Sequence, residues 1–86
     1  MINQKENYVA WALLIEELDD AHEHLGELIK AMVKSGCCEE EDFSVRLGHV
    51  YAHLNRAWHS RSQTSETTSE QWDNFSQFPK DLKPVG

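Results

Sequence analysis

The sequence predicts an all-α fold: an antiparallel two-helix hairpin with a short C-terminal helix or tail, associating into a four-helix bundle. Two long stretches carry apolar residues at alternating spacings of four and three, and a short turn with a glycine separates them. This spacing is typical of helices that pack against each other along one face. Because the turn is short, the two helices must be antiparallel neighbours.

The first helix is predicted over about residues 5–34. Asn3 followed by Glu6 suits an N-terminal cap, and Gly36 suits the left-handed position after the last turn. We expect His22, which occupies a position in the apolar stripe, to be a buried neutral histidine near Tyr51; a ligand or pH-sensing role is the alternative. The stripe consists of Tyr8, Trp11, Ile15, Leu18, His22, Leu25, Ile29 and Met32, flanked by Leu14, Ala21 and Leu28.

The second helix is predicted over about residues 39–61, which completes a hairpin domain over residues 1–61. Four acidic residues, 39–42, form its first turn, where the positive end of the helix dipole favours them. Its apolar stripe consists of Phe43, Leu47, Val50, Leu54 and Ala57.

Two features predict packing surface beyond the contact between the helices. The first turns of the first helix, including Val9 and Leu13, are apolar on every side. The second helix carries a weaker stripe of small residues, Val45, Gly48 and Ala52, that lets another backbone approach. We expect these five residues to lie in an interface.

Residues 62–86 are predicted to be a Ser/Thr-rich linker followed by a short aromatic helix or tail. Its aromatic residues are expected to fold back over the open end of the hairpin near Trp11 and Trp58. Alternatively, they dock into a partner's groove. The tail residues predicted to lie in an interface are Trp72, Phe75 and Phe78.

Length and charge limit the function. The chain has 86 residues, enough for one small domain with a modest core, and a net charge of −7. The acidic balance disfavours nucleic acid and anionic membranes as partners, and suits a basic partner protein. The N-terminal stretch resembles no signal peptide, and the adjacent Cys37 and Cys38 are expected to be reduced thiols. These observations predict a cytoplasmic protein.

The histidines and carboxylates are the best candidates for chemistry. His49 and His53 are spaced i, i+4, and His22 lies three residues after Asp19, so each pair can share a helix face and bind a metal ion. We rate these four as weak metal candidates and predict no cofactor. Three further polar residues of the first helix are expected to point away from the core: Asp20, Glu23 and His24.

No pattern in the sequence indicates an enzyme, because it has no nucleophile with a nearby base and no phosphate-binding glycine loop. The leading hypothesis is a small acidic interaction module that forms a homodimer. A second hypothesis is an acidic inhibitor or immunity-type protein that binds a basic partner. A third is a metal-binding helical bundle.

Overall fold

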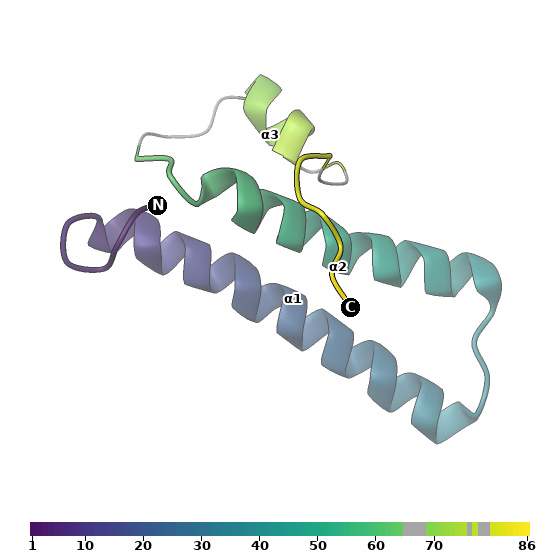
Figure 1. Cartoon of the computed structure of the whole chain (residues 1–86). Helices are drawn as coiled ribbons and strands as arrows, with labels where there is room; N and C mark the ends of the chain where they lie inside the picture. The colour runs from purple at the N-terminus through teal and green to yellow at the C-terminus, as the bar shows by residue number, and fades with distance from the viewer. Residues whose placement is uncertain (65–68, 76, 78–79) are drawn as a thin grey trace.

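The chain folds as an all-α antiparallel hairpin with a short third helix (Figure 1). A computed structural model describes residues 1–64, 69–75, 77 and 80–86. Helix α1 spans Tyr8–Ser35, α2 spans Glu40–Ser60 and α3 spans Ser69–Phe75. Helices α1 and α2 lie side by side, and α3 contacts α2 on its other side (Figure 1). None of the three helices in this part of the chain is long and apolar enough to cross a membrane.

The helix boundaries follow from the backbone at their ends. Gly36 has φ 70° and ψ 11°, and its N–H donates to the carbonyl oxygen of Met32 at 2.8 Å, as predicted for the end of α1. The side chain of Asn3 accepts a hydrogen bond from the N–H of Glu6 at 2.8 Å, but Asn3 is not the N-terminal cap of α1 that the sequence predicted. That bond caps a separate turn, because Asn7 is not helical (φ −134°, ψ 50°) and α1 begins after it.

A pair of glycine substitutions tests this account of the turn. Gly36→Ala should lower the free energy of unfolding by about 1 kcal/mol, because a side chain disfavours positive φ. Gly26→Ala is the matched control inside α1, where an added Cβ meets nothing within 4 Å, and should raise stability by about 0.5–1 kcal/mol. Urea unfolding at one fixed protein concentration measures both. Equal effects of the two substitutions would contradict the assignment.

The contact between α1 and α2 is centred on a different line from the predicted stripe. The buried apolar residues of α1 are Leu14, Ala21 and Leu28, and those of α2 are Val50 and Ala57. The small Ala21 and Ala57 allow the helices to approach along this seven-residue repeat. The apolar stripe predicted to face the second helix is consequently rotated away from α2 and remains partly exposed. The expectation that His22 is buried is wrong.

The N-terminal segment packs against Trp11 at the open end of the hairpin. Ile2 is buried against Leu14 and Ala57, with Trp11 beside them, and its N–H donates to the carbonyl of Arg61 at 2.7 Å. Nothing in the sequence predicted this role for the residues before α1, because Ile2 lies in a short, mostly polar stretch with no periodic pattern.

The tail returns to the hairpin along the outer face of α2. The ring of Phe75 stacks on His59 at 4.7 Å, and the fully buried Asn55 donates from Nδ2 to the carbonyl of Asn74 at 3.3 Å. Further along, Trp58 donates to the carboxylate of Asp81 at 2.8 Å, so the expected contact with Trp58 is made by a polar residue. The third predicted aromatic, Phe78, lies outside the described residues.

Candidate functional site

Three histidines meet on one side of the hairpin. His24 comes from α1, and His49 and His53 come from consecutive turns of α2. The ring centroids are 4.2 Å apart for His24 and His49, 4.8 Å for His49 and His53, and 5.3 Å for His24 and His53. One ring nitrogen of each histidine lies within 4.8 Å of the other two. We refer to these three residues as the histidine cluster.

His24 belongs to the cluster because of where the contact between the helices is centred. The prediction that His24 points outward is wrong: its side chain is half-buried and stacks on His49. At about 100° per residue, His24 lies roughly 60° from Ala21, at the edge of the observed contact. The angle around the helix axis between His24 and the centre of the predicted stripe is about twice as large. The predicted pair of His49 and His53 is indeed adjacent, with their Nε2 atoms 3.2 Å apart.

A carboxylate on α1 holds one member of the cluster. Glu17 accepts from Nε of Arg56 with both oxygens, at 3.1 Å and 3.2 Å, and its Oε2 lies 2.8 Å from Nδ1 of His53. The side chains of Glu17, His53 and Arg56 are 21%, 10% and 11% exposed, so the network is largely shielded from water. It joins α1 to α2 and fixes the orientation of the His53 ring.

Nδ1 of His53 has both an acceptor and a donor beside it. It lies near both Glu17 and Nη2 of Arg56, the latter at 2.9 Å. Because the Arg56 guanidinium only donates, Nδ1 of His53 accepts from Arg56 in one tautomer and donates to Glu17 in the other. Binding of a metal ion through Nε2 uses the second tautomer, with the hydrogen on Nδ1. The Nε2 lone pair of His53 then faces His49. On α1, a carboxylate oxygen of Glu27 lies 3.8 Å from Nδ1 of His24.

The surroundings of His49 favour its neutral form. Loss of contact with water, followed by the charges of His24, His53 and Arg56, lowers the pKa of His49 from its usual value of 6.5, and the charge of Asp20 acts in the opposite direction. Neutral imidazole is the form that binds metal ions.

This shift predicts how stability depends on pH in chelator-treated protein. The folded chain resists protonation of His49, so the unfolded chain binds more protons below about pH 6.5. The free energy of unfolding should therefore fall as the pH is lowered from 7.5 to 5. His49→Asn should make this decline shallower, and urea titrations at several pH values measure the difference. Parallel curves for the two proteins would contradict the prediction.

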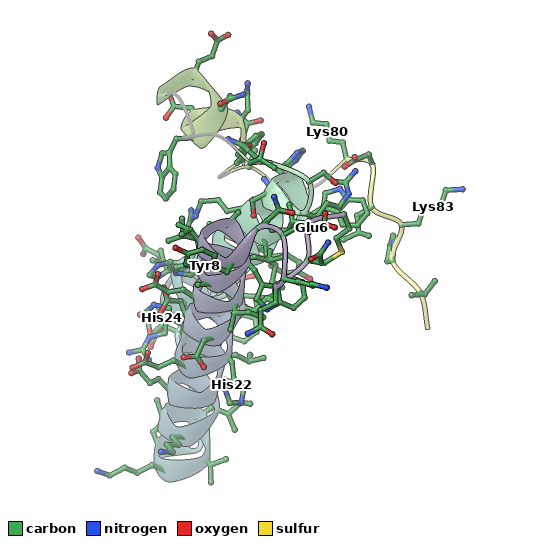
Figure 2. All side chains as sticks on the ribbon, turned by 90° about the vertical axis from the view of Figure 1, so that its left-hand side faces the viewer. Glu6, Tyr8, His22, His24, Lys80 and Lys83 are labelled. Carbon is green, nitrogen blue, oxygen red and sulfur yellow. The ribbon has the colours of Figure 1, made fainter. Side chains whose placement is uncertain are left out.

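The opposite side of the hairpin is apolar. Figure 2 shows His22 and His24 on opposite sides of α1, with Lys80 and Lys83 of the tail on the side of His22. Helical periodicity places several large apolar residues of both helices on that side, each between 37% and 54% exposed. We call this set the apolar flank: Ile15, Leu18, Leu25, Ile29 and Met32 of α1 with Tyr51 and Leu54 of α2.

Four of the predicted interface residues line a groove within the chain. Val9 and Leu13 of α1 face Trp72 and Phe75 of α3 across a groove of about 330 Å³. Arg56 extends into the same groove, with its guanidinium 4.6 Å from the centre of the Trp72 ring. Helix α3 thus lies near the apolar start of α1 but leaves it partly exposed.

The remaining residues predicted to lie in an interface or to bind a metal ion do not join the histidine cluster. Val45 is 68% exposed, and a Cβ added to Gly48 meets nothing within 4 Å. No described part of the chain therefore packs against the predicted small-residue stripe of α2 at these two positions. Ala52 is half-buried. Asp19 and His22 are both exposed on α1.

Comparison of the chain with protein-family models, with curated proteins and with solved structures found no match. The function therefore has to be argued from the two sides of the hairpin.

Proposed function

We propose that this chain is a self-associating interaction module in which the apolar flank of one hairpin covers that of a second copy. The observation that supports this is the position of the large apolar side chains. Among the described residues, the buried apolar set contains only six members, two of them alanines: Ile2, Leu14, Ala21, Leu28, Val50 and Ala57. The leucines and isoleucines of the flank are 39–54% exposed, so covering each contributes roughly half of the about 1.5–3 kcal/mol that complete burial of such a side chain is worth.

The dimensions of the flank suit a dimer. Helices of 28 and 21 residues are roughly 40 Å and 30 Å long, and two adjacent helices are about 20 Å wide. Such a face has an area of roughly 600–800 Å², close to the approximately 800 Å² that each partner contributes to a stable interface. Two hairpins packed through this face form a four-helix bundle.

The sequence pattern along the flank suits a second copy in particular. Ile15, Leu18, Leu25 and Ile29 are members of one stripe with four-three spacing, which favours packing against other helices. The exposed His22 is the polar member of this stripe. A single polar residue in an apolar seam is a known means of setting the register and number of helices in an assembly.

The solution mass tests the proposal. Light scattering on the full chain should give twice the chain mass of 9.9 kDa, and dilution should restore the monomer. Each copy carries a net charge of −7, so added salt should strengthen the dimer by screening repulsion. A monomer at every concentration and salt would reject the proposal. An acidic inhibitor of a basic protein would instead bind its partner more tightly as salt falls.

A cytoplasmic location without catalytic activity is part of this proposal. The chain has only two cysteines, Cys37 and Cys38, and adjacent cysteines bridge each other only with strain, which suits a reducing compartment.

A further inference from the structure

The histidine cluster has the ligand chemistry of a transition-metal site. We propose that His24, His49 and His53 bind one zinc ion or a similar first-row dication, with Glu17 as a positioning residue. Imidazole nitrogens suit zinc, nickel and copper, whereas magnesium and calcium prefer oxygen ligands.

The spacing of the nitrogens fits such an ion. Zinc–nitrogen bonds of about 2.0–2.1 Å at tetrahedral angles place two ligand nitrogens about 3.3 Å apart. The Nε2 atoms of His49 and His53 are 3.2 Å apart. The His24 nitrogen lies within 4.8 Å of both, so a rotation of its side chain brings it to the same spacing. Three protein nitrogens leave a fourth position for water or another ligand.

The residues around the cluster complete the usual arrangement of a metal-binding histidine. Such a histidine donates its other ring N–H to a carboxylate, which fixes the ring and raises the basicity of the ligand nitrogen. With its hydrogen on Nδ1, His53 donates to Glu17 in this way, and Arg56 holds Glu17 in place. Glu27 lies on the Nδ1 side of His24. Because the ligands come from α1 and α2, the ion would clamp the hairpin at its middle.

The site is independent of self-association. His24 lies on the side of α1 opposite to His22 and the apolar flank (Figure 2). Each chain therefore keeps a complete set of ligands whether it is a monomer or a dimer, and the binding stoichiometry is one ion per chain in both cases.

Calorimetric titration of the full, untagged chain with zinc chloride tests the proposal. One ion should bind per chain with a dissociation constant below about 10 μM. His24→Asn and His53→Asn should each weaken binding at least about 30-fold, since each removes a ligand. Cobalt(II) should give the visible absorption bands of a tetrahedral nitrogen site, and the same substitutions should remove them.

Three further variants locate the ion. His22→Asn is the matched control, an exposed histidine on the other side of the same helix, and should leave the affinity within about threefold. Cys37→Ser with Cys38→Ser should also leave it unchanged. Glu17→Gln should weaken binding about tenfold while the helix content is retained, as expected for a positioning carboxylate. Zinc binding weaker than about 100 μM, or binding lost on substitution of the cysteines or of His22, would overturn the proposal.

Discussion

The double substitution Ile15→Glu with Ile29→Glu is expected to convert the dimer into folded monomers. Both residues lie on the apolar flank and are 46% and 54% exposed in the single chain, so the hairpin itself tolerates a polar side chain there. In a dimer the substitutions place four carboxylates in an apolar interface, where each lacks a partner. The dissociation constant should rise at least about 1000-fold, equivalent to about 4 kcal/mol. Light scattering gives the mass, and far-ultraviolet circular dichroism gives the helix content.

A matched control adds the same charge elsewhere. Val9 and Val45 are exposed apolar residues of α1 and α2 that lie off the apolar flank, and both were predicted from the sequence to be interface residues. Val9→Glu with Val45→Glu should leave the dimer intact. If this control yields monomers while the Ile15 and Ile29 variant remains a folded dimer, the interface lies on the outer surfaces and not on the apolar flank.

The two long helices and the turn between them were predictable because local chemistry determines them, whereas the start of α1 was predicted about three residues too early. Gly36 takes the positive φ that ends α1. Of the acidic residues 39–42 predicted for the first turn of the second helix, residues 40–42 lie in that turn and Glu39 is the N-cap. Periodicity also identified which parts of each helix are apolar. The apolar arc of α1 runs from Leu14 across Leu18 to Ile15 and is wider than one partner helix covers. Periodicity alone does not say which edge of that arc faces α2.

That ambiguity explains both errors at the histidines. A contact centred on Leu18 and Leu25 makes His22 a core residue and His24 a surface residue. A contact centred on Ala21 is rotated by about 60° and reverses these assignments. The polar interaction that accompanies the observed orientation of the helices is the network of Glu17, which bonds His53 and Arg56 across the hairpin. A pairing between residues that are 36 and 39 positions apart leaves no periodic signal within one helix.

Zinc should raise the thermal stability of the chain by roughly 10–20 °C. An ion that binds only the folded chain stabilises it by about 2.7 kcal/mol at a free concentration 100 times the dissociation constant. For a domain of this size, each kcal/mol shifts the melting temperature by about 4–8 °C. The histidine cluster joins α1 to α2, and the unfolded chain does not hold the three nitrogens together, so the requirement for selective binding is met. Melting curves with zinc and with a chelator measure the shift.

Histidine substitutions distinguish zinc binding at the histidine cluster from nonspecific zinc binding elsewhere on the chain. In His53→Asn, zinc should no longer raise the melting temperature, whereas in His22→Asn the increase should match that of the unsubstituted chain. The increase should also persist in the Ile15 and Ile29 double variant if that variant stays folded, because the apolar flank lies on the other side of α1 from His24. A shift that survives His53→Asn would place the ion elsewhere on the chain. A shift that disappears with the dimer would place the ion at the interface between copies.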